Sequence, residues 1–156
     1  MQESLGTPLA PLTTMRVGGP ARRLVAAETT DELVDAVREV DDAGEPLLVL
    51  SGGSNVVVAD AGFDGTVVRI ATRGIRAESQ DRCSGATVRV AAGESWDGFV
   101  RHAVQAGWVG VEALAGIPGL VGATPVQNVG AYGQEVADTI AQVRVWDRER
   151  ATVRTL

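Results

Sequence analysis

The pattern of apolar and polar positions predicts a strand, a helix and a second strand in the first third of the chain. Residues 21–27 predict a strand, and the continuous aliphatic run at 47–50 is typical of a buried strand. Between them, aliphatic residues recur at the spacing of a helix face, at Leu33, Val34, Val37 and Val40. Thr29 and Glu32 have the spacing of a capping box, and Gly44 ends the helix. The order of elements is that of a small α/β unit.

Weaker patterns predict further strands on either side of a polar stretch. Short aliphatic runs at 56–58 and 66–70 predict two strands, whereas residues 1–11 show no period and are expected to be irregular. Residues 71–85 are polar and predict an excursion over the surface. Residues 87–92 alternate between apolar and polar, as a half-buried strand does.

The second half of the chain combines one clear helix with a long stretch that periodicity does not assign. Ser95 is a suitable N-cap for a helix that runs to about Ala106, and Gly107 follows as its stop signal. Residues 108–133 carry few charges and many glycines, so no long regular element is expected there. Residues 140–156 predict a hairpin with its turn at 147–150.

Composition narrows the classes of function. The 156 residues are 45% hydrophobic and 22% charged, so we expect a packed core. The formal net charge of −6, with no basic run interleaved with aromatics, argues against a nucleic-acid partner. All fourteen basic residues are arginine, which excludes sites that need a lysine, such as a P-loop or a Schiff base. No apolar stretch approaches the ~20 residues of a membrane span and no signal peptide is seen, so a cytoplasmic location without a membrane partner is expected.

The single cysteine and the single histidine also limit the possible chemistry. Cys83 and His102 cannot build a metal cluster or a disulfide, so no metal site is expected. His102 has no carboxylate three or four positions away, which favours a surface role over a catalytic one. Cys83 has no base nearby in the sequence, which favours an incidental thiol over a nucleophile.

The segment Ser51–Asn55, placed between two predicted strands, is the first candidate site. Gly52 and Gly53 bring several backbone N–H groups together, and these could form a nest for a phosphate or pyrophosphate. Ser54 and Asn55 would add side-chain donors. A hairpin turn would use the same residues for its positive φ angles, so both interpretations stand.

The segment Gly116–Gly133 is the second candidate. It has no charged residue, several glycines and two prolines, so it must bend repeatedly. Gln127, Asn128 and Tyr132 then offer polar groups from an apolar wall, which suits a flat ligand with hydrogen-bonding edges. An irregular core crossing that satisfies its own backbone is the alternative.

Four segments, taken together and in this order, resemble the UDP-N-acetylenolpyruvoylglucosamine reductase (MurB) family. Thr13–Ala21 is similar to the family's T-x-[FM]-x-x-G-G-x-A segment, and Leu50–Val56 to its G-G-S-N flavin loop, where Ser51 replaces the commoner glycine. Ala92–Trp96 resembles the A-G-E-x-W helix entry. Gly116–Gly133 is similar to the long signature I-P-G-x-x-G-x-x-P-x-Q-N-x-G-A-Y-G.

The resemblance implies an α+β fold of the vanillyl-alcohol oxidase (PCMH) FAD-binding type, not a Rossmann fold, whose G-x-G-x-x-G fingerprint the chain also lacks. Residues 1–70 would form one FAD-binding subdomain, and residues 71–156 a second that is incomplete at its C-terminal end, with no substrate-binding domain. The family is cytoplasmic and serves peptidoglycan synthesis. FAD, reduced by NADPH, reduces a UDP-sugar enolpyruvyl ether, and no protein partner is implied.

The family's site residues carry over to two sets of positions. The FAD pyrophosphate would be held by Gly52, Gly53, Ser54 and Asn55. The flavin or the passage to substrate would be bordered by Ala123, Thr124, Gln127, Gly130 and Tyr132. The family's catalytic Arg, Ser and Glu fall beyond the equivalent of Leu156, so no catalytic residue is assigned and the chain alone is expected to be inactive. A flavoprotein of this fold with another substrate, or a non-enzymatic binding module, would be the alternatives.

Overall fold

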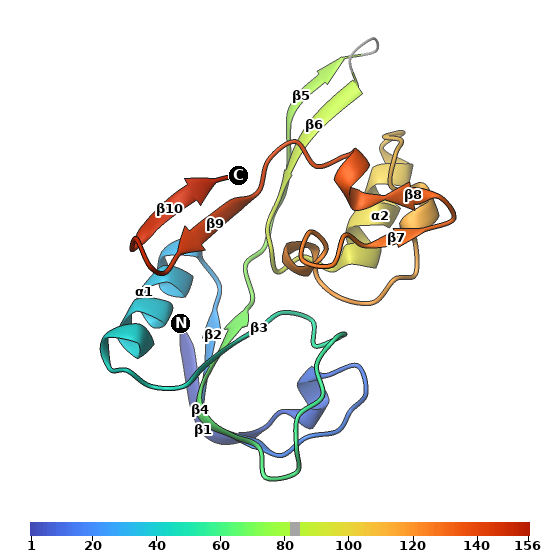
Figure 1. Ribbon diagram of the computed structural model, residues 1–156. Helices are drawn as coiled ribbons and strands as arrows, with labels where there is room; N and C mark the ends of the chain where they lie inside the picture. The colour runs from blue at the N-terminus through green and yellow to red at the C-terminus, as the bar shows by residue number, and fades with distance from the viewer. Residues whose placement is uncertain (82–84) are drawn as a thin grey trace. The chain divides into compact units, whose positions relative to one another are not determined.

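The structure is a computed structural model that describes residues 1–81 and 85–156 (Figure 1). It divides into two compact units, the first formed by Met1–Ala71 with Ala141–Leu156 and the second by Thr72–Ile140. The expected subdomains 1–70 and 71–156 remain a prediction about cofactor binding. By their contacts, residues 141–156 group with the first unit, because the ribbon they form lies against its helix.

The first unit is built on a four-stranded sheet with the order β1-β2-β4-β3. Its elements are β1 (Gln2–Pro8), the short helix η1 (Ala10–Leu12), β2 (Pro20–Ala27), α1 (Thr30–Asp42), β3 (Leu47–Leu50) and β4 (Phe63–Ile70). β4 pairs in parallel with both β2 and β3, and β1 is antiparallel to β2. The predicted strand–helix–strand unit is confirmed, and Thr29 and Glu32 form both hydrogen bonds of the expected capping box.

Alternate residues of the sheet face two apolar clusters. Leu24 and Val67, which are partners in the register, pack with Leu9, Ala21 and Leu50 on one face. The next pair, Val25 and Val68, packs with Ala27 and with Ala36 of α1 on the other face. α1 therefore covers one side of the sheet, and the loops after η1 and β3 cover the other.

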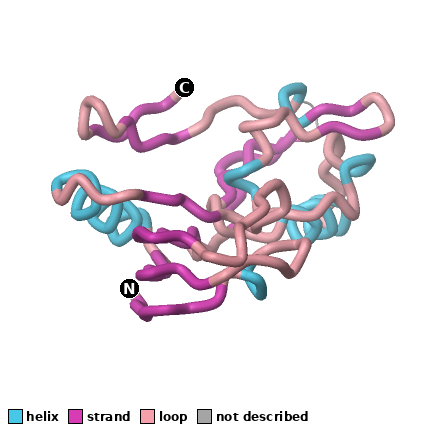
Figure 2. Tube along the Cα trace, turned by 60° about the horizontal axis from the view of Figure 1, so that its bottom comes forward, coloured by secondary structure: helices cyan, strands magenta, loops and turns pink. Residues whose placement is uncertain are grey.

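Two expectations in this unit are wrong. Residues 2–8 form an edge strand, which begins at the N-terminus marked in Figure 2 and has an exposed residue at almost every position. Residues 56–58 form no strand. β3 and β4 are parallel neighbours, with Leu47 opposite Thr66, so residues 51–62 are a crossover between them. Val56 and Val58 pack sideways on the cluster around Leu50 and do not enter the sheet.

The last residues of the chain form the predicted hairpin and lie against α1. β9 (Arg144–Asp147) and β10 (Thr152–Thr155) pair antiparallel, and the ribbon ends at the C-terminus marked in Figure 2. The guanidinium of Arg38 lies 4.5 Å from the centre of the Trp146 ring. Arg148 makes two hydrogen bonds to the carboxylate of Asp41, which lowers the pKa of that carboxyl.

The second unit pairs a ribbon with a helix and a long irregular segment. It contains β5 (Ile75–Asp81), β6 (Gly85–Val90), α2 (Trp96–Gln105), the short helices η2 (Glu112–Leu114), η3 (Val121–Ala123) and η4 (Val136–Asp138), and the small hairpin of β7 (Gly130–Ala131) and β8 (Gln134–Glu135). Its core consists of Trp96, Val100, Ala103, Val111, Leu114, Val129 and Val136. The helix is as predicted, with Ser95 as its N-cap and Gly107 after its end. The polar stretch 71–85 holds strand β5, and Cys83 lies outside the described residues.

Candidate functional site

The loop Ser51–Asn55 lies directly after the carboxyl end of β3, which is parallel to its neighbour. Ligands of open α/β sheets bind at such ends. Because β3 and β4 are parallel, the loop cannot be a hairpin turn between them, and the hairpin interpretation is wrong. Gly53 has a φ of +62°, the left-handed conformation found in backbone nests. Among the described residues, none of the N–H groups from Ser51 to Ser54 donates to a backbone carbonyl, so these donors are available to an anion.

Gly53 sits where a side chain has no room. A Cβ atom at this position would lie 2.2 Å from the carbonyl oxygen of Leu12 and 2.8 Å from the Cα atom of Thr13. In addition, the N–H of Thr14 donates to the carbonyl oxygen of Gly53 at 3.0 Å. Backbone contacts therefore hold the nest against Leu12 and the segment after η1.

The second half of the crossover 51–62, which follows the loop Ser51–Asn55, is held by the same N-terminal segment. The N–H of Gly19 donates to the carbonyl oxygen of Ala59 at 2.9 Å, and a Cβ atom at Gly19 would lie 2.0 Å from the carbonyl oxygen of Asp60. A Cβ atom at Gly62 would lie 1.9 Å from the carbonyl oxygen of Pro20. The Gly18-Gly19-Pro20 motif thus has a structural role, because it fixes the loop that carries the nest.

Ser51 adds a donor that the sequence alone did not assign. Its hydroxyl oxygen is buried, and it has no hydrogen-bond partner within the described residues. A buried hydroxyl without a partner is costly, and such groups normally meet a protein, water or ligand atom. The signal in the sequence was its place, directly after a buried strand and before two glycines.

The second candidate segment is anchored to the entry of α2. The N–H of Val121 donates to the carbonyl oxygen of Glu94, and the N–H of Gly122 to that of Ala92, both at 2.9 Å. A Cβ atom at Gly122 would lie 2.6 Å from the Cβ atom of Ala92, so only glycine allows this approach. The A-G-E-S-W motif therefore supports the start of the Gly116–Gly133 segment, and the segment has no long regular element, as expected.

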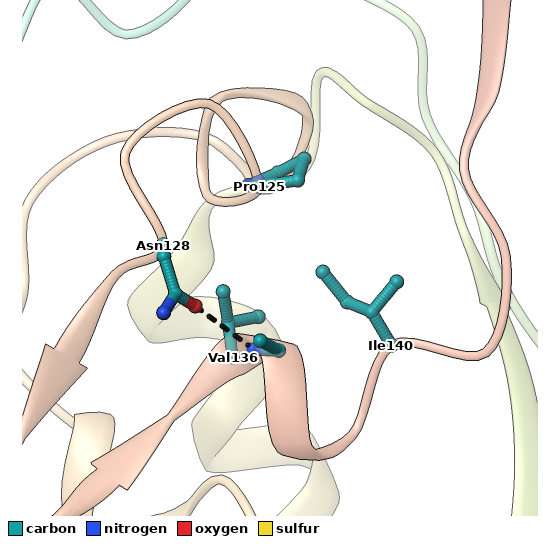
Figure 3. A pocket seen from close by; sticks show the side chains of 5 residues that line it. Pro125, Asn128, Val136 and Ile140 are labelled. Atoms are coloured by element: carbon teal, nitrogen blue, oxygen red, sulfur yellow. Dashed lines mark hydrogen bonds between the residues drawn. The ribbon is translucent and has the colours of Figure 1, made fainter. Parts of the chain in front are cut away.

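Two hollows adjoin this segment. One, of about 770 Å³, is lined by Ile117, Gln127, Asn128, Val129, Gly130, Ala131, Gly133, Gln134 and Glu135. The other, of about 260 Å³, is lined by Pro125, Asn128, Val136, Ala137 and Ile140 (Figure 3). Asn128 belongs to both linings. Its side-chain oxygen accepts a hydrogen bond from the N–H of Ala137, the dashed line in Figure 3.

The predicted flavin residues differ in what they present. Gln127 and Gly130 line the same hollow. Thr124 is buried, and its hydroxyl donates to the carbonyl oxygen of Val121 at 2.8 Å, whereas Ala123 is half-buried in η3. Tyr132 lies between β7 and β8 with a φ of +53° and a side chain that is 95% exposed. Their contacts with a flavin remain a prediction.

Neither segment contributes a charged side chain of its own. The loop Ser51–Asn55 and the segment Gly116–Gly133 contain no ionisable side chain except that of Tyr132, so anion binding at the loop would depend on backbone dipoles. Within the described ranges, no group of three metal-ligating side chains is found. No helix in that part of the chain is long and apolar enough to cross a membrane.

Comparison with known proteins decides the family. A family model described as an FAD binding domain matches residues 21–156. The chain belongs to the FAD-binding domain family. A mixed α+β fold of the FAD-binding PCMH type, distinct from the Rossmann fold, is thereby confirmed. The solved structure of the UDP-N-acetylenolpyruvylglucosamine reductase (MurB) from Thermus caldophilus superposes with a TM-score of 0.75 at 31% identity, over 99% of this chain and 51% of that one.

Curated relatives of this FAD-binding domain are also named as reductases of this kind. The UDP-N-acetylenolpyruvoylglucosamine reductase of Cutibacterium acnes is 64% identical over 148 residues, which is 95% of this chain and 39% of that protein. That of Streptomyces coelicolor is 57% identical over 148 residues, or 95% of this chain and 37% of that protein. The resemblance inferred from the motifs is confirmed. The chain spans about two fifths of the length of the curated relatives it matches.

Proposed function

We propose that this chain carries the FAD-binding segments of a UDP-N-acetylenolpyruvoylglucosamine reductase. In that reaction NADPH reduces FAD, and a hydride then passes to the enolpyruvyl ether of a UDP-sugar, which gives UDP-N-acetylmuramate for peptidoglycan. The names of the relatives support the reaction, and the FAD binding domain match over residues 21–156 supports the cofactor. The substrate is a small molecule, the location is the cytoplasm, and no nucleic-acid, membrane or protein partner is proposed.

The observation that carries this proposal is the loop Ser51–Asn55. Within the described residues it combines a buried Ser51 hydroxyl without a partner, a left-handed glycine with no space for a side chain, and N–H groups from Ser51 to Ser54 that donate to no backbone carbonyl. These features suit the diphosphate of FAD, whose oxygens are hydrogen-bond acceptors. Gly52, Gly53, Ser54 and Asn55 would bind it, and Ser51 would add its hydroxyl.

The flavin ring would lie along the Gly116–Gly133 segment. Ala123 and Thr124 would offer an apolar surface, while Gln127, Gly130 and Tyr132 would meet the polar edge or the passage to substrate. FAD supplies the hydride chemistry when bound, and the role of these residues is to bind the ring and orient it. No residue of this chain is proposed as catalytic, so we expect no turnover of the enolpyruvyl substrate by these 156 residues alone.

The test is the visible flavin absorbance of the purified chain after incubation with FAD and desalting. We expect a near-stoichiometric signal. Ser51→Ala should weaken FAD binding on the order of tenfold, since a hydrogen bond to a charged acceptor is lost. It should not lower the melting temperature without FAD, because within the described residues the hydroxyl has no protein partner to lose and its burial without one is costly.

Ser79→Ala on the exposed strand β5 is the matched control and should bind FAD as the unaltered chain does. A folded chain that retains no flavin would refute the proposed cofactor role of these residues. A Ser51→Ala variant with unaltered affinity would show that the Ser51 hydroxyl does not bind the diphosphate. Flavin that stays with acid-precipitated protein would favour a covalent flavoprotein of the same fold.

A further inference from the structure

The backbone between Gln127 and Val129 turns sharply at Asn128. Asn128 has a φ of +47°, a left-handed conformation that asparagine tolerates better than other residues with a side chain. On one side of the turn Gln127 is exposed and lines the larger hollow. On the other side Val129 is buried. Its N–H donates to the carbonyl oxygen of Thr124, and its carbonyl oxygen accepts from the N–H of Val136. The conformation of Asn128 therefore determines the direction in which Gln127 faces the larger hollow.

The side chain of Asn128 holds that turn against the far side of the β7–β8 hairpin. Its Nδ2 donates to Oε2 of Glu135 at 2.6 Å, and its Oδ1 accepts from the N–H of Ala137 at 3.1 Å. Both ends of the amide are therefore used. Gly130 to Gln134, the hairpin between these attachments, supplies four of the residues that line the larger hollow: Gly130, Ala131, Gly133 and Gln134.

Glu135 is itself held in place. Its backbone N–H donates to Oδ2 of Asp138 at 3.2 Å, at the start of η4. On the same strand β8, Oε1 of the neighbouring Gln134 accepts from the N–H of Ala113 at 3.0 Å, which ties the strand to η2. Asn128 is thus bonded to a fixed partner.

We propose that Asn128 is a positioning residue for the flavin, whose amide fixes the Gln127–Gly130 turn through Glu135 and Ala137. The inference rests on the proposed function, since it needs the flavin to lie along this segment. Asn128 acts through the backbone and through Gln127, and it is not assigned a contact with the ring. The donor and the acceptor of the Asn128–Glu135 hydrogen bond can be exchanged by substitution. A positioning role can therefore be tested separately from a general effect on stability.

The test compares Asn128→Asp with the double variant Asn128→Asp/Glu135→Gln, with FAD affinity measured between about pH 5 and pH 8. The single variant places two carboxylates within hydrogen-bond distance, next to Asp138. They repel when both are charged, and they share a proton at lower pH because like charges raise the pKa of one of the pair. Among the described residues, the further charged group seen to contact the Asn128–Glu135 pair is Asp138.

We expect Asn128→Asp to bind FAD on the order of tenfold more weakly than the unaltered chain at pH 8, with the deficit shrinking as the pH falls. The double variant restores one donor and one acceptor with the direction reversed, so it should recover affinity at every pH. The visible band of the bound flavin should shift in the single variant and return in the double. Gln80→Glu on β5 adds the same charge away from the hairpin and should change neither readout.

A single variant that matches the unaltered chain at every pH would overturn the inference. A double variant that binds FAD no better than the single variant would also overturn it. The inference requires that the re-formed hydrogen bond between positions 128 and 135 restores FAD affinity. If the unaltered chain binds no FAD, the proposed function and this inference fail together. If the unaltered chain binds FAD and only the reversal fails, the inference alone is refuted.

Discussion

Oδ1 of Asp97 accepts a hydrogen bond from the backbone N–H of Gly116 at 2.9 Å. This bond ties the first turn of α2 to the start of the Gly116–Gly133 segment. Arg101 contacts the other oxygen of the same carboxylate. Both interactions favour the charged form, with the Gly116 N–H the larger cause, so the pKa of Asp97 lies below its usual value.

We therefore predict that Asp97→Asn destabilises the chain in a pH-dependent way. Because the folded-state pKa is lower than the unfolded-state value near 3.8, the charged carboxylate stabilises the fold at neutral pH. That stabilisation is lost as the pH falls through the folded-state pKa. The difference in urea midpoint between the unaltered chain and the variant should be largest at pH 7 and shrink below about pH 4. Glu149→Gln, in the exposed turn of the β9–β10 ribbon, controls for a lost charge. A difference that stays constant with pH would contradict the prediction.

A second prediction concerns Gly53, whose left-handed φ is matched by Gly44. The φ angles are +62° and +64°, but a Cβ atom at Gly44 meets nothing within 4 Å, whereas one at Gly53 meets the backbone of Leu12. Gly44→Ala should cost about 1 kcal/mol of unfolding free energy through backbone strain alone. Gly53→Ala should cost roughly 1–3 kcal/mol more, because the loop must move, and it should also weaken FAD binding. Equal urea midpoints for the two variants would show that the close approach does not matter.

A third prediction concerns Arg38, which lies over the ring of Trp146 and also reaches the carbonyl oxygen of Ala151. Arg38→Ala removes a cation–π contact of about 0.5–1 kcal/mol and should loosen the ribbon from α1. Arg38→Lys keeps the charge but lacks the planar group that stacks on a ring, so its effect should be smaller than that of Arg38→Ala. Amide hydrogen exchange of residues 144–155 should be slowest in the unaltered chain, faster in Arg38→Lys and fastest in Arg38→Ala. Arg101→Ala on α2 is the control, and an unchanged exchange rate in Arg38→Ala would contradict the expectation.

The elements that the sequence predicts well are those with signals inside the element itself. Thr29 with Glu32 and Ser95 with Gly107 mark both helices, because capping bonds join residues three positions apart. The two candidate segments also stood out in the sequence, since glycines collect where backbone approaches backbone. Within the nest, the structure shows at Gly53 that a side chain would collide with neighbouring backbone.

What the sequence could not show depends on partners far along the chain. Strand β1 has no apolar alternation, and it exists because its backbone pairs with β2. The parallel pairing of β3 with β4 makes residues 51–62 a crossover, whereas the sequence left open a hairpin turn at residues 51–55. A pattern of residue types also does not show that the Ser51 hydroxyl lacks a partner among the described residues, or that the Asn128 amide makes two bonds.

The order in which the chain leaves the ribosome gives the β9–β10 ribbon a further consequence. Asp41 pairs with Arg148, which is 107 positions later, while residues 72–140 form a unit that is continuous in sequence. The inserted unit can therefore close with contacts of its own as soon as it is synthesised. The unit that begins first must wait, with part of α1 uncovered, until residues 141–156 have been added. Synthesis from the first residue onward thus completes the contacts of the first unit after those of the inserted unit.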